Sequence, residues 1–270
     1  MYELFNVSDK VVVITGGTGV LGASMVEYLA QHGAKVVVLA RNKEKGDELI
    51  DKVRSKGGEA MFLVTDVNNK EILEKNKQDI IEKYKRIDIL INGAGGNMAG
   101  ATIGPDKTIF DLNVDDFKTV VDLNLIGTVL PSMVFGECMT EQKKGSIINI
   151  SSEAALRPLT RVVGYAAAKA AVTNFTKFLA TELATKFGEG LRVNAIAPGF
   201  FITEQNRTLL TQSDGSYTDR GKTIIAHTPF GRFGEPEELL GALHWLASDA
   251  SKFVTGTLTI VDGGFDAFCI

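Results

Sequence analysis

A tyrosine and a lysine separated by three alanines are the first candidates for chemistry in this sequence. Tyr165 and Lys169 are four positions apart, and on a helix this spacing places both side chains on one face. A free tyrosine has a pKa of about 10, too high for proton transfer at neutral pH, whereas a fixed ammonium nearby lowers that pKa. Ser152, upstream at a predicted strand end, supplies a hydroxyl that can polarise a carbonyl oxygen. The set predicts acid–base catalysis at an alcohol or a ketone.

A glycine-rich turn near the N-terminus predicts a second site. Residues 15–22 read Thr-Gly-Gly-Thr-Gly-Val-Leu-Gly, in which Gly17, Gly19 and Gly22 have the G-x-G-x-x-G spacing. Glycines let the backbone approach a pyrophosphate, which the exposed N–H groups of the following helix bind. The turn lies between an apolar run and an amphipathic stretch, which is the context that a dinucleotide site requires. A purely structural turn is the alternative.

The ends of the second and third predicted strands indicate which nucleotide binds. Sites for NAD usually carry an acid at the end of the second strand, where it binds the ribose 2′-hydroxyl. This strand ends instead in Ala40-Arg41-Asn42, and a guanidinium suits a 2′-phosphate. The sequence therefore favours NADP(H), with a solvated Arg41 and bound NAD(H) as the alternative. Asp66 is expected beside the adenine, unless its carboxylate acts as a cap.

Short apolar runs alternate with longer amphipathic stretches, and these elements must position the groups named above. Strands are predicted at residues 11–15, 35–40, 60–64, 87–91, 146–150, 192–196 and 257–261. The longest helical patterns cover residues 114–139 and 163–187, and the last covers 235–247. This alternation predicts βαβ crossovers. We expect one α/β domain over residues 1–270, a Rossmann-like doubly wound parallel sheet of about seven strands with helices on both faces.

One polar segment, residues 203–227, interrupts this alternation. It is too long for an ordinary connection between elements. We expect it to act as a lid over the substrate, and we call it the lid.

The bulk composition argues against several classes of function. The chain has 270 residues with a net charge of −4 and no basic block, so nucleic acid is not expected as a partner. Its two cysteines have no zinc-type spacing, and its three histidines are scattered, so no metal is expected. The N-terminus does not resemble a signal peptide, and the apolar runs are strand-sized. These features predict a cytoplasmic protein without a membrane span.

Taken together, the motifs resemble the short-chain dehydrogenase/reductase family over nearly the full chain. The family's structural Asn-Ala-Gly motif appears as Asn92-Gly93-Ala94-Gly95, and its active-site asparagine resembles Asn124. Pro198-Gly199 matches its segment after the sixth strand, and Thr203 its threonine near the carboxamide. The dinucleotide turn departs from the family pattern in that Val20 stands where a third glycine is usual.

The resemblance implies a role for each catalytic residue. Lys169 would bind the nicotinamide ribose and lower the pKa of Tyr165, which would donate or remove the alcohol proton. Ser152 would orient the substrate oxygen, while Asn124 and a water would connect Lys169 to solvent. The expected cofactor contacts are Gly16, Gly17, Thr18, Gly19, Val20, Leu21, Arg41, Asn42, Asp66, Val67, Asn92, Gly93, Ala94, Tyr165, Lys169, Pro198, Gly199, Ile202 and Thr203. A homotetramer, or else a homodimer, is also implied.

The loops beyond the strand ends should set substrate specificity. Asn97, Arg157 and Arg207 are the predicted substrate contacts, and the arginines suit a carboxylate on a polyhydroxylated substrate. The alternative is that both arginines are surface or subunit-contact residues. Residues 95–97 and 198–207 resemble short-chain-type D-mannonate oxidoreductases (fructuronate reductases), which implies reduction of D-fructuronate to D-mannonate. The other candidates are a gluconate 5-dehydrogenase, a 3-oxoacyl-thioester reductase and, more remotely, a non-catalytic dinucleotide-binding sensor.

Overall fold

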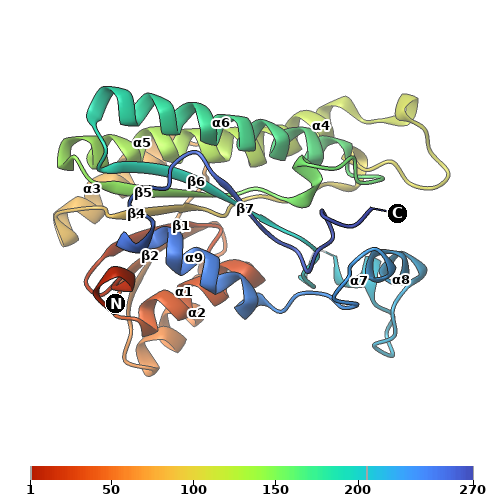
Figure 1. The fold of residues 1–270 in the computed structure, drawn as a ribbon, viewed down its shortest axis with the longest axis horizontal. Helices are drawn as coiled ribbons and strands as arrows, with labels where there is room; N and C mark the ends of the chain where they lie inside the picture. The colour runs from red at the N-terminus through yellow and green to blue at the C-terminus, as the bar shows by residue number, and fades with distance from the viewer. Residues whose placement is uncertain (1, 205, 270) are drawn as a thin grey trace.

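Seven parallel strands form one sheet at the centre of the molecule, in the order β3-β2-β1-β4-β5-β6-β7 (Figure 1). The computed structural model describes residues 2–204 and 206–269. The strands are β1 (Val11–Thr15), β2 (Lys35–Ala40), β3 (Glu59–Val64), β4 (Ile89–Asn92), β5 (Gly145–Ile150), β6 (Leu191–Pro198) and β7 (Leu258–Val261). The predicted Rossmann-like sheet is confirmed, with strand ends within two residues of the expected ones.

Helices cover both faces of the sheet, as Figure 1 shows. One layer contains α1 (Val20–Gln31), α2 (Lys43–Ser55) and α9 (Leu240–Ala247), and the other contains α3 (Lys70–Tyr84), α4 (Val114–Val121), α5 (Gly127–Gln142) and α6 (Val163–Phe187). Because side chains alternate along a strand, Ile14 packs with the first layer and Val13 with the second. Each fully buried aliphatic side chain contributes roughly 1.5–3 kcal/mol.

The strand order locates the ligand site. β1 pairs with β2 on one side and with β4 on the other, so the chain changes direction across the sheet at this point. Open α/β sheets bind ligands in the crevice at such a switch point, beyond the carboxyl ends of the strands. The glycine turn after β1 and the Asn92-Gly93 segment after β4 meet there.

The predicted helix over residues 114–139 is one continuous helical stretch with an irregularity inside it. α4 and α5 are joined by a π-helical turn, Asp122–Ile126, which adds a residue to the turn and is frequent at functional sites. The stretch Val114–Gln142 has the length and hydropathy of a membrane span, but half of it is buried inside the fold. Phe135 and Met139 pack against the sheet, as a core helix requires.

The lid contains two short helices that the sequence pattern did not predict. They are α7 (Arg207–Leu210) and α8 (Asp219–Ala226), which lie beside the edge where the strands end (Figure 1). Leu210 and Ile224 form a small apolar cluster with Phe233, separate from the two main clusters. The lid therefore packs largely on itself and its adjoining segments, and its role as a lid stays a prediction.

Candidate active site

The three residues expected to carry proton chemistry share one cavity at the carboxyl edge of the sheet. Ser152 follows β5, and Tyr165 and Lys169 lie on consecutive turns at the start of α6. All three line a cavity of about 310 Å3. The Ser152 hydroxyl is near enough to Tyr165 to lower the pKa of its phenol, and Lys169 Nζ lies 5.6 Å from the centre of the Tyr165 ring. The structure thus brings the predicted set together.

The electrostatics of this set differ in one respect from the expectation. Lys169 is 3% exposed, and this burial lowers the pKa of its ammonium to about 8. Its Nζ donates to the Ile150 carbonyl over 2.7 Å. Burial also raises the pKa of Tyr165, against a smaller lowering by the hydrogen bond with Ser152. Desolvation at the ring therefore outweighs the hydrogen bond, and the pKa of Tyr165 is raised overall; its lowering by Lys169 in the presence of the cofactor stays a prediction.

Asn124 is fixed beside this cavity by the π-helical turn. Its Nδ2 donates to Gly96 O over 2.7 Å and to Val120 O over 2.8 Å, and its Oδ1 accepts from Gly96 N over 3.2 Å. A Cβ on Gly95 would lie 2.6 Å from Asn124 Oδ1 and 3.3 Å from Lys169 Nζ. Gly95 is therefore a requirement of the site, although the sequence marked it only as part of a motif. The water relay through Asn124 stays a prediction.

A second cavity, of about 350 Å3, continues from the first along the ends of β1 to β4. Gly16 has φ +69°, and a Cβ there would lie 2.7 Å from the backbone of residues 93 and 94. Gly19 caps α1 without a side-chain hydrogen bond, so the first N–H groups of this helix are available to an anion. A backbone cradle of this kind fits a dinucleotide pyrophosphate.

Most predicted cofactor contacts line these two cavities. They are Gly16, Thr18, Gly19, Val20, Leu21, Arg41, Asn42, Asp66, Val67, Gly93, Ala94, Tyr165, Lys169, Pro198, Gly199 and Thr203. At the adenine end, the Asp66 carboxylate also accepts from Asn68 N over 3.0 Å, so Asp66 both lines the cleft and caps its own turn.

Three predicted cofactor contacts, Gly17, Asn92 and Ile202, are not among the residues that line the two cavities, and their contact with a cofactor stays a prediction. A Cβ on Gly17 would meet the Val38 side chain at 2.8 Å, so this glycine allows α1 to pack on the sheet. Asn92 Nδ2 donates to Asn149 Oδ1 over 2.8 Å and to Ser132 Oγ over 2.9 Å. Ile202 packs against the small apolar cluster of the lid. Each supports the wall and does not line it.

An ion pair that the sequence did not predict spans the rim of the cofactor cleft. Lys45 Nζ, in the first turn of α2, lies 2.8 Å from Glu204 Oε2 at the start of the lid. Glu204 itself lines the cleft near Arg41, and both partners are exposed. The pair connects the nucleotide side of the site to the lid.

The structure does not place the predicted anion partners of the substrate in the lining of the catalytic cavity. Arg157 Nε lies 2.9 Å from Asp266 Oδ1, and its guanidinium also donates to the Asp266 carbonyl. Arg207 is exposed on α7. Neither lines the catalytic cavity, whereas Asn97 does, together with an arginine that the sequence pattern did not reveal, Arg220 of α8. No motif marked Arg220, and only its predicted place in the lid could have suggested it.

Glu153, directly after Ser152, is a buried acid that no motif singled out. It is 1% exposed, and neither carboxylate oxygen has a hydrogen-bond partner within the described ranges. Burial and, to a smaller extent, the carboxylates of Asp262 and Asp266 raise its pKa to about 7, while Arg157 opposes them. The group is consequently near half-protonation at neutral pH.

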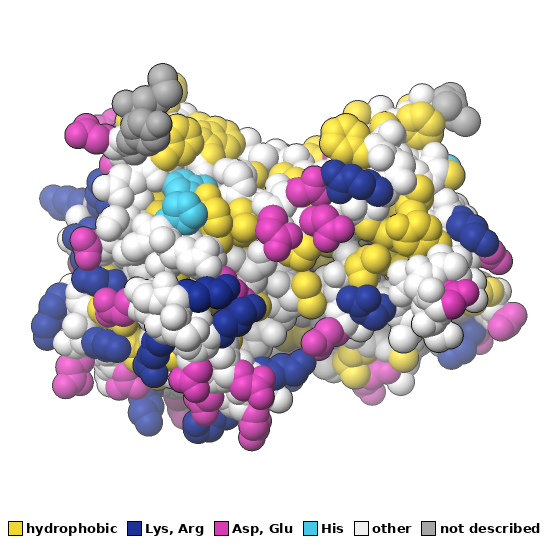
Figure 2. All heavy atoms as spheres, turned by 90° about the horizontal axis from the view of Figure 1, so that it is seen from below, with side chains coloured by type: hydrophobic (Ala, Val, Ile, Leu, Met, Phe, Trp, Pro, Cys, Tyr) yellow, Lys and Arg dark blue, Asp and Glu magenta, His cyan; other side chains and the backbone are white. Residues whose placement is uncertain are grey.

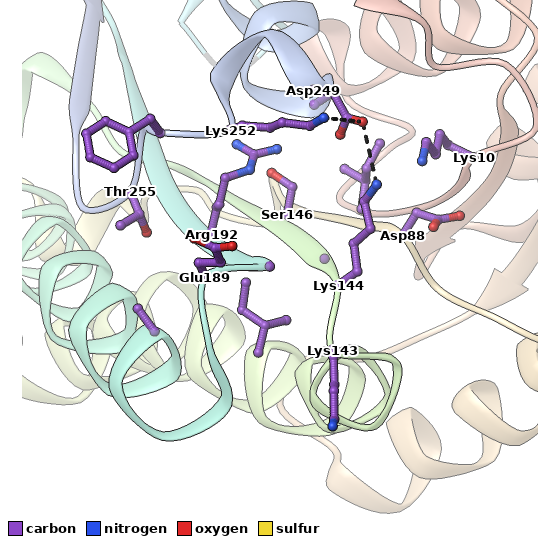
Figure 3. Close-up of a pocket in the computed structure, with 17 residues that line it drawn as sticks. Lys10, Asp88, Lys143, Lys144, Ser146, Glu189, Arg192, Asp249, Lys252 and Thr255 are labelled. Carbon is purple, nitrogen blue, oxygen red and sulfur yellow. Dashed lines mark ion pairs between the residues drawn. The ribbon is translucent and has the colours of Figure 1, made fainter. Parts of the chain in front are cut away.

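A larger cavity, of about 650 Å3, lies at the opposite edge of the sheet (Figure 3). Its cations serve the fold: the Arg192 guanidinium donates to the carbonyls of Leu246 and Ser248 at the end of α9. Lys144 and Lys252 both pair with Asp249, at 3.5 and 3.6 Å. Cations at a helix C-terminus stabilise it, so the charges of these three residues have partners within the fold. In the part of the chain that the structure describes, no three His, Cys, Asp or Glu side chains group to hold a metal.

Comparisons with known proteins agree with this geometry. The family model described as short chain dehydrogenase matches residues 10–214. The uncharacterised oxidoreductase UxuB of Bacillus subtilis (strain 168) is 45% identical, over 97% of each chain. A provisionally named D-mannonate oxidoreductase from Haemophilus influenzae, solved with bound NAD, is 40% identical with a TM-score of 0.91, over 98% of this chain and 97% of that one. A gluconate 5-dehydrogenase from Burkholderia cenocepacia J2315, solved with NADP and tartrate, is 31% identical with a TM-score of 0.87, over 99% of each chain.

Proposed function

The chain belongs to the short-chain dehydrogenase family, and from this premise we propose that it interconverts a ketone and a secondary alcohol on a sugar acid. The pair we propose is D-fructuronate and D-mannonate, with NADP(H) as the cofactor. Membership establishes an oxidoreductase that acts on CH–OH groups and uses a nicotinamide dinucleotide. The substrate and the preference between NADP and NAD are the proposed parts.

Each catalytic side chain of the cavity has a separate role in the proposed ketone reduction. A nicotinamide held in the cleft would supply the hydride for the carbonyl carbon. Ser152 Oγ donates a hydrogen bond to the carbonyl oxygen, and Tyr165 Oη donates the proton that completes the alcohol. Lys169, with a pKa of about 8, keeps its ammonium mostly protonated at pH 7 and binds the ribose. Proton transfer of this kind contributes about 10²–10⁴-fold to the rate.

The single observation that supports an acidic, polar substrate is the charge of the catalytic cavity. Asn97, Asn206 and Arg220 line it, and no Asp or Glu does so among the described lining residues. Arg220 is one of two cations in the lining, and the other, Lys169, is committed to catalysis. The similar proteins from Haemophilus and Burkholderia are named for sugar acids, and the latter was solved with the dicarboxylate tartrate.

The proposal of NADP(H) rests on the nucleotide end of the cleft. Arg41 is exposed there at the end of β2, where an NAD site would carry an acid. A guanidinium in this position suits the 2′-phosphate. NAD(H) is the alternative, because the similar Haemophilus protein holds NAD.

A gluconate 5-dehydrogenase is the second candidate, favoured by the Burkholderia neighbour. A 3-oxoacyl-thioester reductase acting on an acidic carrier protein would need a basic docking patch. On the face of α1, α2 and α9, Figure 2 shows Lys and Arg side chains interspersed with Asp and Glu. A non-catalytic sensor would be expected to lack Tyr165 or Lys169, and both are present with Ser152 and Asn124.

We further propose that the protein works in the cytoplasm on small molecules, as a homotetramer or homodimer. The family resemblance supports the assembly, as do apolar side chains exposed on the helical layer, Met133 of α5 and Phe178 of α6. Gel filtration with light scattering measures the assembly directly.

The proposed activity is tested by NADPH and NADH oxidation with four substrates: D-fructuronate, 5-keto-D-gluconate, D-fructose and an acetoacetyl thioester. The highest kcat/KM is expected for D-fructuronate with NADPH. A preference for 5-keto-D-gluconate transfers the assignment to gluconate chemistry. A preference for the thioester, or for fructose, contradicts the sugar-acid proposal and leaves the family assignment intact.

A further inference from the structure

The cation that Arg220 brings into the catalytic cavity lacks a compensating charge. Its guanidinium makes two long hydrogen bonds, both 3.3 Å, one to Thr160 Oγ1 and one to Thr160 O. Among residues 2–204 and 206–269, no carboxylate lies within ion-pair distance of it. A partly buried charge without a counterion is unfavourable, so the arrangement is suited to receive an anion.

A second cation near Arg220 strengthens this conclusion. Burial lowers the Arg220 pKa, and Arg161, next to the Thr160 contact, lowers it further because the two guanidinium groups repel each other. Two guanidinium groups near each other are stabilised by an anion between or beside them. The backbone of Arg161 has φ +78°, and its carbonyl accepts from Ile103 N over 2.9 Å.

Arg220 belongs to the lid, whereas Thr160 belongs to the loop between β5 and α6, so their contact joins the lid to the catalytic part. Within the lid, α8 is packed tightly on α7: a Cβ on Gly221 would lie 2.4 Å from Leu210 O. Thr218 Oγ1 donates to Leu209 O over 2.7 Å. The two helices therefore form one packed unit, so a ligand that binds Arg220 contacts that unit.

We propose that Arg220 binds the substrate carboxylate between α8 and the Thr160–Arg161 loop, and that this contact fixes the lid over the catalytic cavity. The inference rests on the proposed sugar-acid function. It adds to that function Arg220 and the lid, as the residue and the segment that recognise the substrate carboxylate. A guanidinium can bind a carboxylate through two parallel hydrogen bonds, which orients the acid as well as attracting it. The lid would then close only on substrates that carry the charge.

The test compares D-fructuronate with D-fructose, which differ in the carboxylate and share the ketone. The wild-type protein is expected to prefer D-fructuronate by about 10²-fold or more in kcat/KM. Arg220→Ala should remove most of that preference while it retains turnover of D-fructose, which also shows that the variant is folded. Arg220→Lys should recover only part, since an ammonium cannot form the paired contact.

Arg207→Ala is the matched control, because Arg207 lies on the same lid but is exposed and outside the cavity lining. It should keep the wild-type preference. A second readout is amide hydrogen exchange over residues 207–226 with D-mannonate and NADP bound. Exchange should slow in the wild-type protein and in Arg207→Ala, and not in Arg220→Ala.

Different results would contradict the sugar-acid function, the assignment of Arg220 and the closure of the lid. If the wild-type protein treats D-fructuronate and D-fructose alike, the sugar-acid function itself is wrong. If the wild-type preference is present and Arg220→Ala keeps it, the function stands and the assignment of Arg220 is wrong. If Arg220→Ala loses the preference but exchange in its lid still slows on binding, Arg220 binds the acid, and the proposal that this contact fixes the lid is wrong.

Discussion

The catalytic floor and the lid of this protein are built in opposite ways. The catalytic floor consists of Gly95, Asn124, Ser152, Tyr165 and Lys169. Its polar atoms are held by hydrogen bonds at the ends of strands and helices, such as the 2.7 Å bond from Lys169 Nζ to Ile150 O. Among the residues that the structure describes, the lid packs on a small cluster with three buried apolar residues, and its cavity-lining Arg220 is held by contacts of 3.3 Å. Proton chemistry needs fixed geometry, whereas recognition here is assigned to the less constrained segment.

The largest expected effect tests the floor. Tyr165→Phe should lower kcat by at least about 10²-fold with nearly unchanged cofactor affinity, because the proton donor is removed and the ring packing is kept. Steady-state kinetics and cofactor titration measure the two quantities. A variant that keeps more than about a tenth of wild-type kcat would show that Tyr165 is not the proton donor.

The difference between floor and lid also explains what could be predicted from sequence. Ser152, Tyr165 and Lys169 were predictable because periodic strands and helices fix where their side chains point. Arg157 and Arg207 were chosen by nearness in sequence to Ser152 and to the start of the lid. Nothing local revealed that Asp266, more than a hundred residues away, pairs with Arg157.

The fold followed from hydrophobic alternation, but two local features did not. The π-helical turn at Asp122–Ile126 is a local irregularity between two helical stretches, so the overall pattern predicted a single long helix. The lid helices are only four and eight residues long, and their apolar residues pack on a small cluster completed by Phe233. Both features depend on tertiary contacts that sequence spacing does not encode.

Glu153, directly after Ser152 of the floor, is a buried acid whose carboxylate oxygens have no hydrogen-bond partner in the described ranges. Its pKa is about 7 in the folded protein, against an ordinary value of 4.5 for a glutamate. Between these values the folded state keeps a proton that the unfolded state loses, so stability falls as pH rises from 4.5 to 7. The full loss is at most about 3 kcal/mol.

Glu153→Gln removes the titration and keeps the size of the side chain. Urea unfolding at several pH values should show that wild-type stability falls relative to the variant between pH 4.5 and pH 7. Equal pH dependence of the two proteins would mean that the Glu153 carboxyl finds a partner or water on ionising, and that the floor has no unsatisfied acid.

The nucleotide cleft also combines a tightly packed part, the glycine turn, with an exposed part, Arg41. The glycine turn is tightly packed, since a Cβ on Gly22 would lie only 2.4 Å from Gly16 O, whereas Arg41 is exposed at the rim. Arg41→Ala should reduce the NADPH/NADH ratio of kcat/KM by the worth of a charge-assisted contact, about 1.5–3 kcal/mol. An unchanged ratio would identify Arg41 as a solvated residue and favour NAD(H).

The smallest expected effect concerns the tether between the two regions, the ion pair of Lys45 and Glu204. Both side chains are at least half exposed, and such pairs typically contribute about 0.2–1 kcal/mol. A double-mutant cycle with Lys45→Ala, Glu204→Ala and the double variant should therefore give a coupling in the free energy of unfolding below about 1 kcal/mol. The coupling should fall further in high salt, because exposed charges are screened. A coupling well above this range would mean that the lid is anchored to α2 as firmly as the floor is held. Closure would then have to break a strong contact, and a loosely tethered lid that the substrate carboxylate draws into place would no longer describe the molecule.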